Sequence, residues 1–236
     1  MIIDNPFEIC RRGTTLPAEQ VAHWRERLQR APDDREARLV LLGATEGAER
    51  YSHALYLIET EPTWWLMGRS TIPSGRPEYE RGCALFRAAV ERHDDPQVAL
   101  NAARFVLLFE PERGFVFFEL AEDRHGRGRP LLLALATYVD EVLTLSTAQG
   151  DAPSPALASR AMRLHKTLLL TDTASEVQAR VRAVVRFARL GSEGRLAPQL
   201  EHFVPLSSRR DLSVAEIEEM RSRFSSAVDD LDARHK

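Results

Sequence analysis

The chain has 236 residues, of which 44% are hydrophobic and 28% charged, and its formal net charge is −3. This apolar content supports a buried core and argues against disorder, while the lack of a basic excess argues against a dedicated nucleic-acid binder. Two cysteines, Cys10 and Cys83, are too few for a metal-type cluster or a disulfide framework. The N-terminus carries Asp4 and Glu8 and lacks the pattern of a signal peptide, and we find no apolar run of the ~18 residues that a membrane span needs. We therefore predict a cytoplasmic protein without a membrane segment.

Apolar residues at helical spacing predict three helices in the first quarter of the chain. Pro17 suits a first helical position, and the sequence Pro32-Asp33-Asp34 ends one helix and starts the next. The predicted helices cover about 17–31, 35–45 and 47–61. A short apolar segment, 63–67, and a loop rich in Pro, Ser and Gly, 70–76, follow.

The centre of the chain contains the same helical segment twice. Residues 80–93 return as residues 112–125, with seven of fourteen positions identical at an offset of 32. Self-similarity at a period of about 20–50 residues is typical of stacked supersecondary units. A partner helix, 98–109, lies between the two copies. Because Phe115 of the second copy stands where Cys83 stands in the first, we expect Cys83 to be a buried thiol in an apolar position.

The remainder of the chain also predicts helices, and no credible strand or hairpin signal occurs. One strongly apolar helix covers 131–145 and another 156–170; Thr173-Ala-Ser-Glu176 and Ser213-Val-Ala-Glu216 match capping boxes that open two more. Residues 196–205 fit a short helix. The segment 149–155 is the linker candidate, which separates a repeat region, 1–148, from a C-terminal helical region, 156–236. We expect this region to continue the repeat stack as one domain.

The repeated helix resembles the second helix of tetratricopeptide repeats (TPRs), which carries a small residue, an aromatic residue four positions later and an alanine three after that. Gly82, Phe86 and Ala89 match this pattern, and Gly114, Phe118 and Ala121 match it again. The resemblance covers about 17–125. It implies an all-α fold, an α-α superhelix of stacked helix hairpins with a C-terminal helical extension, and a groove that holds a peptide. The first helices depart from the family, because Leu100, Arg104 and Leu107 stand where its Trp, Gly and Tyr would fall.

The sequence offers little support for catalysis or metal binding. Glu122 and His125 have the Glu-x-x-His spacing of di-iron bundles, but such sites need that motif twice, and His93 has no glutamate three residues before it. A histidine at a helix C-terminus, beside the negative end of the helix dipole, explains both histidines. The loop 125–129 lacks the preceding strand of a phosphate loop, and no catalytic nucleophile motif occurs. We predict no enzyme, no metal and no cofactor.

Three features are candidates for partner binding. Trp64 and Trp65 are adjacent, so they cannot both face a core, and the one that does not is a candidate anchor at an interface. Arg104 lies on the helix between the repeat copies. A basic stripe on one helical face is formed by Arg182, Arg186 and Arg189. This stripe fits either an acidic partner or an ordinary solvated face, and it lacks the interleaved aromatics of single-stranded nucleic-acid binders.

These observations favour a non-enzymatic protein–protein interaction module or adaptor that binds a partner protein or peptide. The alternative is an immunity-type inhibitor or regulator that binds one cognate toxin or enzyme. A nucleic-acid-binding or metal-dependent helical protein is a minor alternative. The sequence leaves the partner and the oligomeric state open.

Overall fold

The computed structural model describes residues 5–69, 72–150, 155–173, 176–177, 179–183, 185, 205, 209 and 212–234. In these residues the regular structure is helical and no strand occurs, which confirms the all-α prediction. The chain divides into two compact units, Met1–Arg127 and Gly128–Lys236. This division falls after Arg127. The linker expected at 149–155 stays a prediction, since 151–154 lie outside the described residues.

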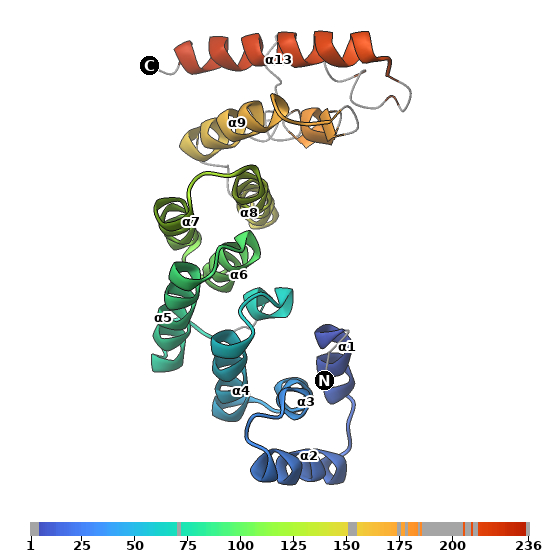
Figure 1. The fold of residues 1–236 in the computed structure, drawn as a ribbon, viewed down its shortest axis with the longest axis vertical. Helices are drawn as coiled ribbons and strands as arrows, with labels where there is room; N and C mark the ends of the chain where they lie inside the picture. Colours follow the sequence, from blue (N-terminus) through green and yellow to red (C-terminus); the bar gives the residue numbers. More distant parts are fainter. Residues whose placement is uncertain are drawn as a thin grey trace. The chain divides into compact units, whose positions relative to one another are not determined.

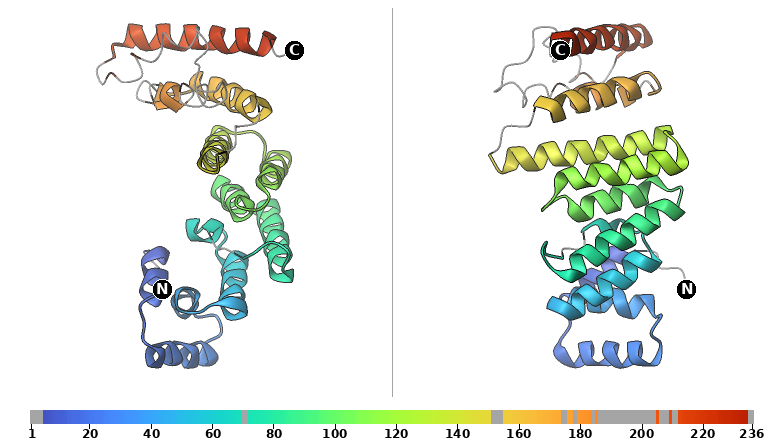
Figure 2. Two further views of the ribbon diagram at one scale, coloured as in Figure 1. Left: turned by 180° about the vertical axis from the view of Figure 1, so that it is seen from behind. Right: turned by 90° about the vertical axis from the view of Figure 1, so that its left-hand side faces the viewer.

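The first unit is built from short helices packed in succession. Their bounds are α1 (Pro6–Gly13), α2 (Ala18–Arg30), α3 (Arg35–Ala44), α4 (Gly47–Thr60), the 3-10 helix η1 (Trp65–Arg69), α5 (Pro77–Arg92), α6 (Pro96–Val106) and α7 (Pro111–His125). The helix α3 packs against α1, α2 and α4, and α6 packs against η1, α5 and α7. Within this unit, α4, α5 and α7 follow one another in a row, with α3, η1 and α6 beside them in a second row (Figures 1 and 2).

Side-chain caps and prolines define where these helices begin. The carboxylate of Asp34 accepts a hydrogen bond from the backbone N–H of Ala37 at 3.0 Å, and that of Asp95 accepts one from Gln97 at 2.8 Å. Asp34 belongs to the Pro/Asp sequence expected to separate two helices, and each aspartate satisfies an otherwise unpaired N–H of the first turn. The helix α1 was not predicted. Asn5 caps it by accepting from the backbone N–H of Glu8, and Pro6 follows as its first residue.

The backbones of α1 and α3 meet at a pair of glycines. A Cβ atom on Gly13 would lie 2.1 Å from the carbonyl oxygen of Val40, and one on Gly43 would lie 1.9 Å from the carbonyl oxygen of Cys10. No side chain fits in this contact, so glycine at both positions lets α1 lie directly on α3. This contact fixes the position of α1 within the first unit.

The repeated helices α5 and α7 bury the residues that carry the repeat. Phe86 and Phe118 are both buried, as the register predicts. The ring of Phe105, from α6, lies where a Cβ atom on Gly82 would be, at 2.6 Å from that position. Phe105 also stacks on Tyr79 and packs at a tilt against Phe86, each with ring centroids 5.4 Å apart. The small residue therefore makes room for a ring from the neighbouring helix.

The second unit contains α8 (Arg129–Ala148), α9 (Pro155–Leu169) and α13 (Val214–Arg234) within its described part, and α9 packs against both α8 and α13. At both predicted capping boxes a glutamate accepts a hydrogen bond from the backbone N–H of the first residue, Glu176 from Thr173 at 2.7 Å and Glu216 from Ser213 at 2.8 Å. These bonds are the largest cause that lowers the pKa of each glutamate to about 2.

The helix α8 is long and apolar enough to meet a length-and-composition criterion for a membrane span, although the sequence predicted no such segment. Buried core helices meet the same criterion. In α8, 39% of the most apolar stretch is buried, and Asp140 near its centre is hydrogen-bonded to His165 of α9. The Asp140–His165 bond is part of the packing of α8 against α9 within the second unit.

Candidate partner-binding surface

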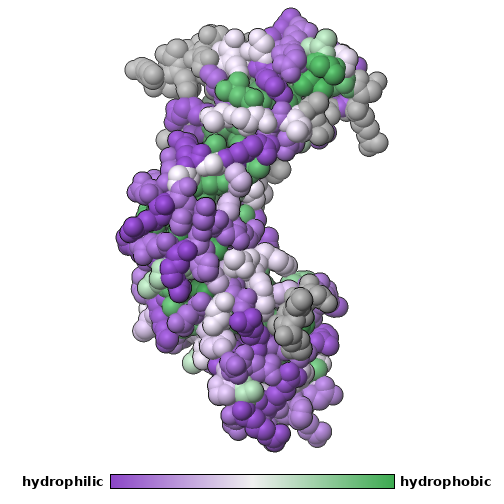
Figure 3. Space-filling model, in the orientation of Figure 1, coloured by the Kyte–Doolittle hydropathy of each residue, from purple (hydrophilic) through white to green (hydrophobic). Residues whose placement is uncertain are grey.

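The surface of the first unit is largely hydrophilic in the orientation of Figure 3, with hydrophobic residues in small separate areas. Most large apolar side chains of this unit are buried. The exposed ones among its described residues are Phe7, Trp65, Leu108, Phe109 and Val116. Two of these side chains, Phe7 and Trp65, lie next to each other. A third, Val116, lines a recess between α5 and α7.

The pair consists of Phe7 on α1 and Trp65 on η1, and we call it the aromatic patch. The side chains are 39% and 40% exposed, and their ring centroids lie 5.2 Å apart. The guanidinium of Arg69 lies 5.7 Å from the Trp65 ring centroid, within the range of a cation–π interaction. Segments distant in sequence thus present two neighbouring rings to solvent.

The structure holds η1 in place through a buried asparagine of α6. The side-chain amide of Asn101 donates to the carbonyl oxygens of Pro62 at 2.8 Å and Trp64 at 3.0 Å, and its own oxygen accepts from Gln97 at 2.7 Å. Gly68 completes this contact, since a Cβ atom there would lie 2.9 Å from the Cα atom of Asn101. The backbone that carries Trp65 is therefore attached to α6 by directional bonds, which preorganises the ring.

The six residues predicted for partner binding fall into three groups. Trp64 is half-buried and Trp65 exposed, so neither of the adjacent tryptophans is fully buried in the core. Arg104 is half-buried on α6, and its Cβ atom lies 3.0 Å from the position of a Cβ on Gly68, next to η1. Arg182 is exposed in the second unit, whereas Arg186 and Arg189 lie outside the described residues. The structure thus gathers Trp64, Trp65 and Arg104 around η1.

Three further residues of this surface were missed by sequence reasoning. Phe7 was overlooked because α1 was not predicted, although Asn5-Pro6 is a helix-start signal. Arg69 was assigned no role. Asn101 was detectable as a polar residue inside an apolar helix, and a buried amide of this kind needs hydrogen-bond partners.

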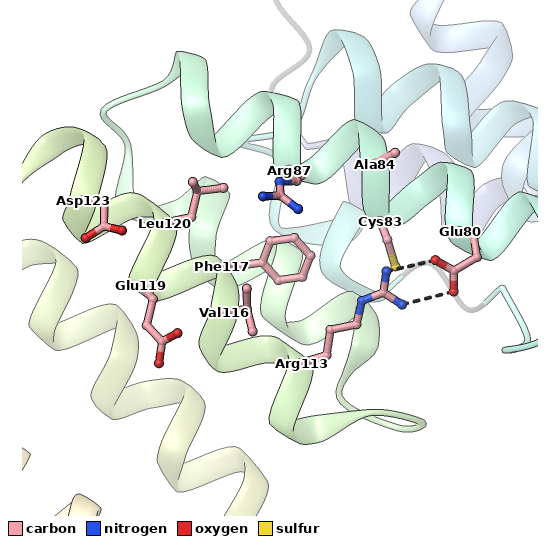
Figure 4. A pocket seen from close by; sticks show the side chains of 10 residues that line it. All are labelled: Glu80, Cys83, Ala84, Arg87, Arg113, Val116, Phe117, Glu119, Leu120 and Asp123. Atoms are coloured by element: carbon pink, nitrogen blue, oxygen red, sulfur yellow. Dashed lines mark hydrogen bonds and ion pairs between the residues drawn. The ribbon is translucent and has the colours of Figure 1, made fainter.

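The recess lies between α5 and α7, and we call it the α5–α7 groove (Figure 4). It has a volume of about 400 Å³. Its apolar lining consists of Cys83, Ala84, Val116, Phe117 and Leu120. Burial raises the pKa of the Cys83 thiol to about 11, so the thiol stays protonated at neutral pH and acts as part of an apolar surface, as expected.

An ion-pair cluster closes one end of this groove. Arg113 of α7 donates to both carboxylate oxygens of Glu80 on α5, at 2.9 and 3.1 Å, and to Glu110 at 2.9 Å. These hydrogen bonds raise the pKa of Arg113 and lower that of Glu80. A two-pronged bond of this kind fixes the register of α7 on α5. Away from this closed end, Arg87 lines the groove on the α5 side. Glu119 and Asp123 line it on the α7 side (Figure 4).

The residues considered for metal binding have other contacts. His125 donates from Nε2 to the carbonyl oxygen of Val90 at 2.8 Å, which ties the end of α7 to α5. A search of the described residues finds no group of three or more His, Cys, Asp or Glu side chains that could hold a metal ion. We therefore interpret His125 as a residue that attaches the C-terminal end of α7 to α5.

The second unit contains a buried charged network. The Asp172 carboxylate is fully buried and accepts hydrogen bonds from Arg180 and, at 3.2 Å, from Arg129; its backbone carbonyl accepts from Arg221 at 2.7 Å. A buried carboxylate needs such donors to offset its lost hydration. The network joins α8, α13 and the segment that contains Arg180.

His165 of α9 links Arg180 of this network to Asp140 of α8. Arg180 Nη1 lies 3.3 Å from His165 Nδ1, and a guanidinium only donates, so Nδ1 is the acceptor. His165 therefore carries its proton on Nε2, which donates to Asp140 at 3.1 Å. Each of these side chains is hydrogen-bonded to another residue of the second unit, so we interpret the network as part of the core of that unit.

Comparisons of the chain with protein-family models, with curated proteins and with solved structures find no match.

Proposed function

We propose that the chain is a non-enzymatic interaction protein that binds a partner protein or peptide through its first unit. In this proposal the first unit is a divergent TPR-like stack that follows an α-α superhelix. The pairs α3–α4 and α6–α7 support it, since the two helices of each pair are consecutive and packed together. The helix α5 departs from this pattern, because the 3-10 helix η1 that precedes it packs against α6 and α4.

The aromatic patch carries the proposal. Neighbouring exposed apolar side chains rimmed by polar residues mark candidate interaction sites, and Trp is among the residues enriched as anchors at interfaces. Here the support is rigid: α1 lies on α3 through Gly13 and Gly43, and η1 is bonded to Asn101. A partner that covers these rings buries apolar area without having to order them first.

The absence of enzymatic function is part of the same proposal. The thiol of Cys83 is kept protonated by burial, and His125 is bonded to a backbone carbonyl. His53 is buried, with neither ring nitrogen hydrogen-bonded. These groups lack the nucleophile–base geometry that covalent catalysis requires.

The test compares capture of partners by the purified chain and by variants of the patch. Full-length protein is immobilised and exposed to an extract of the native organism, and retained proteins are quantified by mass spectrometry. We expect Trp65→Ala and Phe7→Ala to reduce retention of a partner by about tenfold or more. Phe109→Ala is the matched control, because Phe109 is 41% exposed and lies outside the patch. Equal retention by Trp65→Ala, Phe7→Ala and the unaltered chain would contradict the proposal.

The same measurement separates an adaptor from an inhibitor. Several partners lost together from Trp65→Ala indicate an adaptor, because one preformed anchor then serves different proteins. A single partner retained at one-to-one stoichiometry indicates a dedicated inhibitor or regulator.

A further inference from the structure

The first unit has a second surface suited to binding, and it shares no residue with the aromatic patch. In the α5–α7 groove, Val116 is 52% exposed although Phe117 beside it is buried, so an apolar strip continues from the core to solvent. On α7, Val116 and Leu120 are four residues apart and therefore lie on one helical face. On α5, Cys83 and Ala84 form the opposite wall.

The walls of this groove come from two α-helices, which determines the kind of chain that fits. Helices satisfy their own backbone N–H and C=O groups internally, so the groove offers side chains and no open backbone edge. A peptide that binds as an added β-strand gains most of its affinity from backbone hydrogen bonds, which this surface does not provide. A helical segment brings its backbone already bonded and inserts only side chains. The volume of about 400 Å³ suits a few apolar side chains.

The charges along the groove favour a basic occupant. Its lining includes three carboxylates, those of Glu80, Glu119 and Asp123, and two guanidiniums, those of Arg87 and Arg113. Arg113 is held by Glu80 and Glu110, and Arg87 lies 3.8 Å from Glu91. Within the lining itself, three carboxylates therefore stand beside two guanidiniums, and one of these guanidiniums is paired with Glu80. Two of the carboxylates, Glu119 and Asp123, are one turn apart on α7.

We propose that the α5–α7 groove binds an amphipathic α-helix of a partner protein. Two large apolar residues of that helix, three or four positions apart, contact Val116, Phe117 and Leu120. Lysine or arginine residues on its flank face Glu119 and Asp123 of α7. This inference extends the proposed function to a second face of the first unit, and it is tested with variants that leave Phe7 and Trp65 unchanged.

The probe is a displayed library of helix-forming peptides, selected on the full-length chain. We expect the selected peptides to carry a positive net charge and an apolar pair at the stated spacing. Val116→Asp should weaken their binding by about tenfold or more, because it places a charge in the apolar strip. Leu108→Asp is the matched control, since Leu108 is 56% exposed and lies outside the groove, and it should change binding by less than about twofold.

Charge reversal provides a second readout that does not depend on the apolar strip. The double variant Glu119→Arg, Asp123→Arg should weaken binding of the selected basic peptides by about fivefold. It should improve binding of the same peptides with glutamate on the flank. Equal binding of basic-flanked and acid-flanked peptides to the unaltered chain would overturn the proposal. So would a selection that yields no peptide sensitive to Val116→Asp. Either result leaves the Trp65→Ala and Phe7→Ala comparison intact, so the two proposals fail separately.

Discussion

Both units of this chain have an apolar core, but the described part of the second unit also contains a buried charged network. In the first unit, rings of Tyr79, Phe86 and Phe105 pack around a glycine, and ion pairs such as Arg25–Glu49 lie at the surface. In the second unit, the fully buried carboxylate of Asp172 is surrounded by arginines. Apolar packing tolerates salt and loses stability when volume is removed, whereas a buried charge cluster fails when one partner is lost. The units should therefore respond to different substitutions.

Two optical signals allow this comparison to be tested. The three tryptophans, Trp24, Trp64 and Trp65, all lie in the first unit, so tryptophan fluorescence reports on that unit alone. Circular dichroism reports helix in both units. Urea unfolding followed by both signals separates an effect on one unit from an effect on the other.

The largest effect is expected from Phe86→Ala. Phe86 is fully buried against Phe105, and its removal should lower the free energy of unfolding of the first unit by about 3–5 kcal/mol. The fluorescence midpoint should move to lower urea. Phe109→Ala, at an exposed position, serves as the control and should have a smaller effect. A loss below about 1 kcal/mol for Phe86→Ala would contradict the packing of the repeat.

The second effect, at Asp172, should appear in the other unit. Asp172→Asn removes the negative charge that compensates Arg180 and should cost about 3 kcal/mol. The loss should appear in circular dichroism, with the fluorescence midpoint unchanged. Glu219→Gln is the control, because the Glu219–Arg223 pair is exposed, and it should cost less than about 0.5 kcal/mol. An equal shift in both signals would show that the units unfold together.

The third effect depends on pH, reaches its full size only at the acidic end of the range, and belongs to the first unit. Burial is the main cause that lowers the pKa of His53 to about 4, while the histidine of the unfolded chain titrates near 6.5. Between these values the unfolded chain binds more protons, so stability falls as pH falls from about 6.5 to 4, by up to about 3 kcal/mol. The difference between the unaltered chain and His53→Leu, measured by fluorescence, isolates this contribution. Replacing the exposed His93 by glutamine is the control. A difference that is constant across this pH window would refute the assignment.

The sequence was a good guide where structure depends on local pattern. The repeat placed α5 and α7 correctly and identified Phe86 and Phe118 as buried, because helical period and burial are linked. The Asp34 and Asp95 caps were also recognisable as helix boundaries, since the capping group is adjacent to the amide it satisfies.

The sequence was a poor guide where contacts join distant segments. The segment 63–67 was recognised as short and apolar, but nothing in its own residues indicates that Asn101 bonds to it from α6. The proximity of Phe7 and Trp65 likewise depends on two glycines that let α1 lie on α3. The Asp172 network joins four segments, and its arginines are indistinguishable in sequence from solvated ones. Long-range geometry, rather than residue type, decides these contacts.

The two native thiols, Cys10 half-buried and Cys83 buried, have a practical consequence for labelling. Burial raises the pKa of Cys10 as well as that of Cys83, so neither presents much thiolate at neutral pH. A cysteine introduced at an exposed position such as Glu119 or Phe7 should react with maleimide reagents much faster than the native pair. Fluorescent or spin probes can therefore be directed to either face of the first unit, with Cys10 as the native thiol to compare against.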